Sequence, residues 1–140
     1  MQDKVFLDTN ILLYCYSNDE IEKQKISLSI LDTTDNLLIS HQVINELSNV
    51  LFKKFKLNAH DIENVILEID NVLTVISFNI TTQIKAIRLK EKYKLQFYDA
   101  LIIATAIENE CTILYSEDMQ HEQLIDSCLT IINPFKSSND

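Results

Sequence analysis

The chain has 140 residues, of which 46% are hydrophobic and 24% charged, and its formal net charge at pH 7 is −9. This length is typical of one globular domain, which we expect over residues 1–135, followed by a flexible C-terminal tail at 136–140. The chain contains no glycine. Walker-type and dinucleotide-binding loops are therefore excluded, because their backbones need glycine to approach a phosphate closely. The nucleophile elbow of the α/β-hydrolases is excluded as well, because its strained turn needs small residues.

Short apolar runs alternate with helical patterns along the chain. The predicted strands lie at residues 4–7, 37–39, 73–76, 112–115 and 129–132. The predicted helices lie at 10–16, 20–31, 42–55, 58–69, 80–93 and 98–108, with a brief one at 121–126. Right-handed crossovers between such strands imply an α/β fold of three layers, in which helices cover both faces of a parallel central sheet of about five strands. In the absence of glycine, backbone turns with positive φ are expected at Asn18, Asn36, Asn79 and Asn109.

The sequence predicts a cytoplasmic protein. Its longest nearly apolar run, residues 100–107, is too short to span a membrane, and its N-terminus lacks the layout of a signal peptide. Cys15, Cys111 and Cys128 are odd in number and have no paired spacing, so we interpret them as buried free thiols of a reducing compartment. A zinc site that combines them with the three histidines is disfavoured, because no ligand pair has the usual spacing.

Four acidic residues fall at the predicted strand ends or at the starts of helices. Asp8 follows the first strand, Glu46 lies early in the helix after the second strand, Asp99 opens the helix before the fourth strand, and Asp118 follows that strand. Ligands bind at this edge of parallel sheets, so the four carboxylates are expected to lie close together. Asp8 and Asp99 could each simply cap a helix. Glu46 is harder to explain in that way, because it flanks the buried stripe of its helix.

A cluster of four carboxylates needs positive charge. Two carboxylates about 5 Å apart repel each other by roughly 3 kcal/mol at an effective dielectric constant near 20. Protons or a cation must therefore neutralise the cluster, and ligands that are all oxygen select a hard ion, Mg²⁺ or Mn²⁺. Such a site is suited to phosphoryl chemistry.

Four segments in this order resemble a known family. They are VFLDTN at 5–10, SHQVINEL at 40–47, FYDALIIATA at 97–106 and ILYSEDM at 113–119. The chain resembles a PIN-domain ribonuclease of the kind found as VapC-type toxins in bacterial toxin–antitoxin pairs, and the resemblance covers essentially the whole chain. It implies a single PIN domain with a PIN-like three-layer fold that cleaves single-stranded RNA by metal-dependent hydrolysis.

The resemblance also implies roles for individual residues. Asp8, Glu46, Asp99 and Asp118 match the family's acidic positions that hold Mg²⁺ or Mn²⁺ and carry catalysis. Asp8 and Asp99 would bridge to the metal, and the other two acids would complete its shell directly or through water. The supporting polar positions are matched by Asn10 and Ser116, with Glu117 second to its neighbour Asp118.

The family resemblance implies an RNA substrate, a cognate antitoxin protein and a homodimer, with no membrane partner. Most of the basic residues lie in two clusters, which are either solvated helix faces or cationic rims that guide RNA. The residues assigned to possible RNA binding are Lys53, Lys54, Lys56 and Arg88.

Other interpretations compete with the nuclease. A phosphoacceptor receiver domain needs an acidic pair after its first strand and a Lys–Pro after its last, whereas here the last strand leads to Asn133 and Pro134. A phosphatase with an aspartyl nucleophile needs a second Asp where Asn10 stands. The remaining alternative keeps the fold without the chemistry, as a non-catalytic PIN-like module that binds RNA or protein.

Overall fold

The computed structural model describes residues 3–136 and has the α/β fold that the sequence predicts. Its strands are β1 (Val5–Leu7), β2 (Leu37–Ser40), β3 (Thr74–Ile76), β4 (Ile113–Tyr115), β5 (Leu124–Ile125) and β6 (Leu129–Ile132). Its helices are α1 (Thr9–Cys15), α2 (Ile21–Thr33), α3 (His41–Lys53), α4 (Ala59–Val72), α5 (Ile80–Tyr93) and α6 (Phe97–Glu108). The predicted tail at 136–140 lies outside the described residues except for Lys136.

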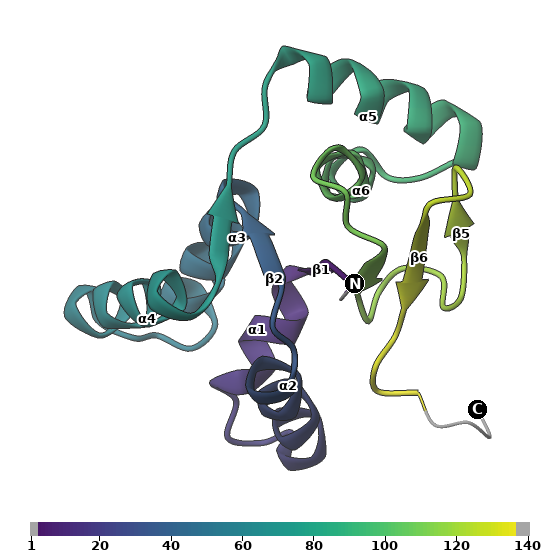
Figure 1. Ribbon diagram of the computed structural model, residues 1–140. Coiled ribbons are helices and arrows are strands. Elements are labelled where there is room, and N and C mark those ends of the chain that lie inside the picture. Colours follow the sequence, from purple (N-terminus) through teal and green to yellow (C-terminus); the bar gives the residue numbers. More distant parts are fainter. Residues whose placement is uncertain (1–2, 137–140) are drawn as a thin grey trace.

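The strands form one sheet in the order β3-β2-β1-β4-β6-β5, and every neighbouring pair except β5 and β6 is parallel. Strand β1 is central, between β2 and β4, and all three of its residues are buried. Although β3 and β6 are linked through parallel neighbours, they point in very different directions in Figure 1 because the sheet is strongly twisted. Because β1 is parallel to both β2 and β4, the carboxyl ends of these three strands lie at the same edge of the sheet.

Helices flank the sheet on both sides. In Figure 1, α1 and α2 lie together below the central strands, and α5 and α6 lie above them. The most deeply placed helix is α6, in which every residue from Ala100 to Ala106 is buried. Because α6 leads back into the start of β4, its own first turn lies toward the carboxyl ends of the strands. No helix in residues 3–136 is long and apolar enough to span a membrane.

The predicted brief helix at 121–126 is wrong. This segment contains β5, which pairs antiparallel with β6 and adds a sixth strand to the sheet. The two strands are joined by a tight turn in which Asp126 and Ser127 have φ of 49° and 57°, and Cys128 N–H donates to the carbonyl of Ile125. Two consecutive positive φ values match the twist of a hairpin, and usually Asn–Gly supplies them. The Asp–Ser pair here gives a weaker sequence signal.

The predicted positions of positive φ are also wrong. The residues that adopt it within the described chain are Lys56, Lys94, Glu110, Glu122, Asp126 and Ser127. Asn79 instead has an extended backbone and caps α5 with its side chain, in a reciprocal arrangement with Thr82. Asparagine is thus used here for the acceptor oxygen of its side chain rather than for its conformational tolerance.

The three cysteines are free, but they are not all buried as predicted. Cys111 is buried, Cys15 is half-buried, and Cys128 is exposed. Cys128 lies in the β5–β6 connection, outside the core.

Lys94 ends α5 in the left-handed conformation, with φ 58° and ψ 48°. This conformation is unfavourable for a residue with a Cβ atom, whereas glycine adopts it without that cost. We predict that Lys94→Gly raises the free energy of unfolding by about 0.5–1 kcal/mol, after allowance for the entropy that glycine adds to the unfolded chain. The matched control is Lys90→Gly in the last turn of α5, which should lower it by about 1 kcal/mol. Urea unfolding measures both, and a loss of stability in Lys94→Gly would contradict the prediction.

Candidate active site

Asp8 lies at the end of the central strand and caps α1. Its Oδ1 accepts a hydrogen bond from the backbone N–H of Thr9 at 2.7 Å, and its Oδ2 accepts one from the hydroxyl of Ser116 at 2.8 Å. The side chain is buried, with 7% of the residue exposed. Burial raises the pKa of Asp8 from 3.8 to about 6, with Glu46 and Asp99 adding to the rise, although the two hydrogen bonds oppose it. The structure thus holds this carboxyl group in place without a positive partner.

Glu46 is held beside Asp8 by two uncharged donors. The hydroxyl of Thr9 donates to its Oε2 at 2.7 Å, and Nε2 of Gln42 donates to its Oε1 at 2.8 Å. Gln42 lies one turn before Glu46 on α3, and this helix begins where the Ser40 hydroxyl accepts from the N–H of Val43. Sequence reasoning missed Thr9 and Gln42. The available signals were the position of Thr9 next to Asp8 and the spacing of four residues between Gln42 and Glu46.

Asp118 is exposed in the loop after β4, where Asn10 of α1 binds it. Nδ2 of Asn10 donates to Oδ2 of Asp118 at 3.1 Å, and Oδ1 of the same amide accepts from the backbone N–H of Glu117 at 3.4 Å. The Ser116 hydroxyl, which donates to Asp8, also accepts from the N–H of Met119. Asn10 and Ser116 therefore fix this loop against the end of β1.

Asp99 lies in the first turn of α6 and is half-buried. Burial raises its pKa, and the neighbouring carboxylates Asp118 and Glu46 raise it further. The same type of electrostatic interaction links Asp8 with Glu46 and Asp99. All four predicted acids are therefore electrostatic neighbours at the edge where β1, β2 and β4 end. Within residues 3–136, however, no three His, Cys, Asp or Glu side chains are arranged closely enough to hold one metal ion as they stand.

Glu117 belongs to a different interaction network from its neighbour Asp118. Its carboxylate accepts hydrogen bonds from Tyr14 and Lys23, and Lys23 also lies over the rings of Tyr14 and Phe135. Burial, which would raise the pKa of Glu117, is outweighed by these hydrogen bonds and by the lysine charge, so the pKa is lowered. The side chain is thus occupied by a cation of the protein itself, a role that the sequence did not reveal.

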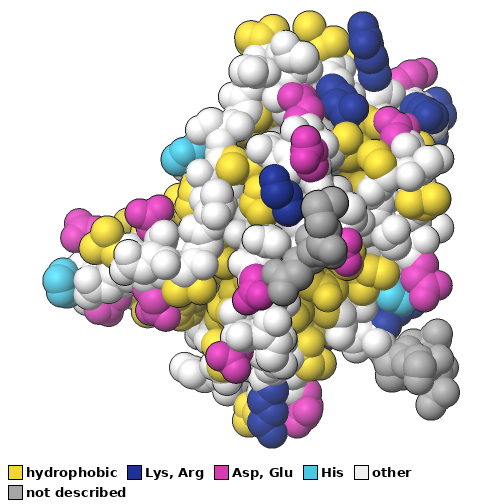
Figure 2. Space-filling view, viewed as in Figure 1, with side chains coloured by type: hydrophobic (Ala, Val, Ile, Leu, Met, Phe, Trp, Pro, Cys, Tyr) yellow, Lys and Arg dark blue, Asp and Glu magenta, His cyan; other side chains and the backbone are white. Residues whose placement is uncertain are grey.

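The basic residues assigned to RNA binding are exposed and lie apart from the acids. Lys53 is seven residues after Glu46, which corresponds to about 10 Å along the axis of α3, and Lys54 and Lys56 follow it. Arg88 lies on α5, and Figure 2 shows basic side chains gathered over that helix. No hydrogen bond or ion pair in the described part of the chain joins these four residues to the acidic cluster.

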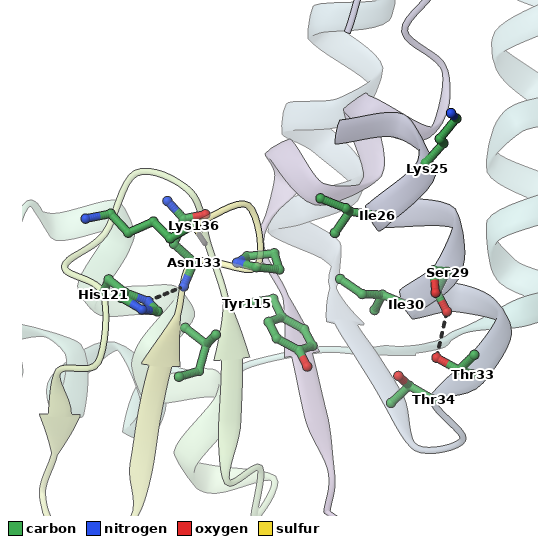
Figure 3. Close-up of a pocket in the computed structure, with 12 residues that line it drawn as sticks. Lys25, Ile26, Ser29, Ile30, Thr33, Thr34, Tyr115, His121, Asn133 and Lys136 are labelled. Carbon is green, nitrogen blue, oxygen red and sulfur yellow. Dashed lines mark hydrogen bonds between the residues drawn. The ribbon is translucent and has the colours of Figure 1, made fainter. Parts of the chain in front are cut away.

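A cavity of about 520 Å³ lies between α2 and the ends of β4 and β6 (Figure 3). None of the four acids lines it. His121 points toward Asn133 in this view, and its Nδ1 accepts the backbone N–H of Asn133 at 2.9 Å. His121 therefore has a structural partner at the start of the segment after β6.

A family model for the PIN domain matches residues 5–125. No curated protein matches the chain. Among solved structures, a toxin–antitoxin complex from Klebsiella pneumoniae is similar, with 21% identity and a TM-score of 0.72 over 96% of this chain and 100% of that one. VapC20 from Mycobacterium tuberculosis, described as a sarcin-ricin loop cleaving toxin, has 13% identity and a TM-score of 0.68 over 82% and 90% of the two chains.

A third similar structure is VapBC2 from Rickettsia felis, bound to a DNA fragment from its promoter. It has 17% identity and a TM-score of 0.65, over 91% of this chain and 96% of that one. Sequence identities this low support similarity of fold alone. Membership of the family rests on the family model, which matches most of the sequence. The chain belongs to the PIN domain family.

Proposed function

We propose that this protein is a metal-dependent endoribonuclease that hydrolyses RNA phosphodiester bonds in the cytoplasm. The observation that carries the proposal is the buried carboxylate of Asp8, which has no cationic partner. Its neighbours Glu46, Asp99 and Asp118 are also acidic. Buried carboxylates are usually paired with a cation or bound to a metal, and the partly buried Glu117 is paired with Lys23. The four acids have no such partner among residues 3–136, which is the usual state of a site that receives its positive charge from a ligand.

The chemistry of these side chains fits Mg²⁺ or Mn²⁺. The donors are all carboxylate oxygens, with amide and hydroxyl groups behind them, and such oxygen-only sets suit hard divalent ions. Asp8 and Asp99 would hold the ion, and Glu46 and Asp118 would complete its shell directly or through water. A bound ion would supply charge neutralisation at the phosphate and a lower pKa for the attacking water.

The surrounding residues of this chain position the acids. Thr9 and Gln42 fix both oxygens of Glu46, and Ser116 fixes one oxygen of Asp8. Asn10 joins Asp118 to α1. Such hydrogen bonds to ligating carboxylates hold them in one geometry and reduce the reorganisation needed when a substrate binds.

The further proposal is that the protein is the toxin of a toxin–antitoxin pair. The likeness to the Klebsiella pneumoniae complex over nearly the whole of both chains supports an antitoxin partner. A homodimer is supported by exposed isoleucines along one face of α5, where Ile80, Ile84 and Ile87 are 74%, 46% and 57% exposed. Lys53, Lys54, Lys56 and Arg88 would guide an extended RNA strand, an effect restricted to low salt because exposed charges are screened.

The central experiment compares the wild type with Asp99→Asn on a labelled pool of structured RNAs. We expect cleavage in Mg²⁺ or Mn²⁺, none in EDTA, and a loss of roughly 100-fold or more in Asp99→Asn, since even groups behind a metal ligand are worth 10- to 100-fold. The matched control is Asp61→Asn, which removes an acid from the first turn of α4 and should cleave like the wild type. Equal cleavage by wild type and Asp99→Asn would exclude the site. If neither cleaves while metal still binds the wild type alone, the non-catalytic PIN-like module is favoured.

The adjacent acids Glu117 and Asp118 should respond differently to loss of charge. Asp118→Asn should lower cleavage by roughly 10-fold or more, because it weakens the proposed metal shell. Glu117→Gln should leave cleavage within about threefold and instead lower the free energy of unfolding by about 1 kcal/mol, because it weakens the contact with Lys23. RNA cleavage and urea unfolding measure the two effects. The assignment fails if Glu117→Gln loses as much activity as Asp118→Asn.

The raised pKa of Asp8 predicts a pH dependence of stability in the metal-free protein. The folded state keeps the proton of Asp8 up to about pH 6, whereas the unfolded state releases it near 3.8, so stability should fall as pH rises through this interval. The full loss corresponds to about 3 kcal/mol. Asp8→Asn has no such proton. In EDTA, the variant should therefore become more stable relative to the wild type as the pH rises from 4 to 7.

The control for this measurement is Asp61→Asn, which should keep the wild-type dependence on pH. Mg²⁺ should restore stability to the wild type at pH 7, because a ligand that binds only the folded state stabilises it. A wild-type curve parallel to that of Asp8→Asn over the whole interval would contradict the prediction.

A further inference from the structure

A cavity of about 650 Å³ opens next to Glu46, between α3, the start of α6 and the region around the start of α5. It is separate from the cavity in Figure 3 and shares Gln42 and Glu46 with the acidic site. Its volume is in the range of pockets that bind small organic groups. Whatever binds in it therefore lies directly beside the acids.

The walls of this cavity carry amides and aromatic rings. The amides belong to Gln42, Asn45, Asn49 and Gln83, and the rings include Phe97 and Tyr98. Glu46 is its only acid, and neither lysine nor arginine lines it. A phosphate would find no lysine or arginine in this cavity, and His41 is the one basic side chain of the lining.

Two glutamines that line this cavity each have a buried amide oxygen without a hydrogen-bond donor. Nε2 of Gln42 donates to Glu46 Oε1 at 2.8 Å and to the carbonyl of Tyr98 at 3.3 Å, and both partners can only accept. These two bonds identify the nitrogen end of the Gln42 amide, so its Oε1 is the unpaired atom. Gln42 is only 8% exposed, so its unpaired oxygen is unfavourable until a donor reaches it. Oε1 of Gln83 is also buried without a partner.

The aromatic side of the cavity offers a flat platform. Tyr98 is 67% exposed, and its ring meets that of Phe97 edge to face with 5.7 Å between the centroids. An exposed tyrosine beside buried acceptors is the combination with which proteins bind unpaired bases, by stacking on the ring and hydrogen bonding to the edge. The lining also includes Phe78 and Leu101. The apolar face of a partner helix could pack on the rings, but it would leave the amides of the cavity without hydrogen-bond partners.

We propose that this cavity is a binding subsite for one unpaired nucleobase of the RNA, next to the phosphate that is cut, and that it favours bases with an exocyclic amino group. This inference rests on the proposed ribonuclease function for its substrate class. The free acceptors of Gln42 and Gln83 call for N–H donors. The exocyclic amino groups of adenine, cytosine and guanine each supply two N–H donors at the base edge, whereas uracil has only the single N3–H of its ring. Terminal amide torsions are broad, so a small rotation turns either oxygen toward the cavity.

The test uses free nucleosides, because they carry no phosphate and cannot be cleaved. Adenosine, cytidine and uridine are titrated into the ¹⁵N-labelled full-length protein in EDTA, and the side-chain amide signals of Gln42, Asn45, Asn49 and Gln83 are followed by NMR. Dissociation constants in the millimolar range are expected from one stacked base. Adenosine or cytidine should shift these signals with an affinity roughly fivefold or more above that of uridine.

Variants of the platform make the test specific. Tyr98→Ala should abolish the shifts, and Tyr98→Phe should retain them because the ring remains. The matched control is Leu67→Ala, which truncates an equally exposed apolar side chain on α4 and should bind like the wild type. The inference is overturned if no nucleoside shifts these signals, if uridine binds as well as adenosine and cytidine, or if Tyr98→Ala binds unchanged.

Further outcomes distinguish this inference from the proposed function and from a contact between two copies of the chain. If nucleosides bind as expected but no RNA is cut in Mg²⁺ or Mn²⁺, the subsite stands and the proposed function fails. If RNA is cut but these amides do not respond to nucleosides, the function stands and the subsite fails. Shifts of the same signals on dilution of the protein alone would assign the cavity to a contact between two copies of the chain and would overturn the inference.

Discussion

The structure depends on the placement of one carboxylate, that of Asp8, at the buried end of the central strand. Strand β1 has a parallel neighbour on each side, so the segments that follow β1, β2 and β4 must all leave the sheet at one edge. Asp8 is at the centre of that edge, and its neighbours are an N–H group, a hydroxyl group and other acids. A buried charge without a cationic partner is costly, so the fold maintains it at the expense of stability.

The same few residues show a difference between a structural acid and the acids of the proposed site. Glu117 and Asp118 are adjacent, yet one is paired with Lys23 between two aromatic rings and the other is held by the uncharged amide of Asn10. Uncharged donors hold a carboxylate in place but leave its charge, whereas a lysine holds the carboxylate in place and also neutralises its charge. All the hydrogen-bond donors described to Asp8, Glu46 and Asp118 are uncharged, and this preserves the negative potential that a cation needs.

The sequence predicted the general fold and the proximity of the acids because both follow from local patterns. Apolar runs that alternate with helices determine a parallel sheet, and a parallel sheet brings its strand ends together, so Asp8, Glu46, Asp99 and Asp118 could be placed without knowledge of their contacts. The β5–β6 hairpin was missed because its turn uses Asp126 and Ser127 in place of the residues that usually signal it. Thr9 and Lys23 were missed because their partners lie 37 and 94 residues away in the sequence.

In the proposed subsite, Gln42 would link the choice of the bound base to the arrangement of the acids. One end of its amide donates to Glu46 and the other end carries the unpaired oxygen beside the cavity. Hydrogen bonds in series polarise one another, so a donor bound at Oε1 would make the Nε2–H groups better donors to Glu46. A base in the cavity would therefore act on the carboxylate through a single side chain. In the proposed complex, a base with an exocyclic amino group would strengthen the hydrogen bond from Gln42 to Glu46, and a base without one would leave the amide as it is in the free protein.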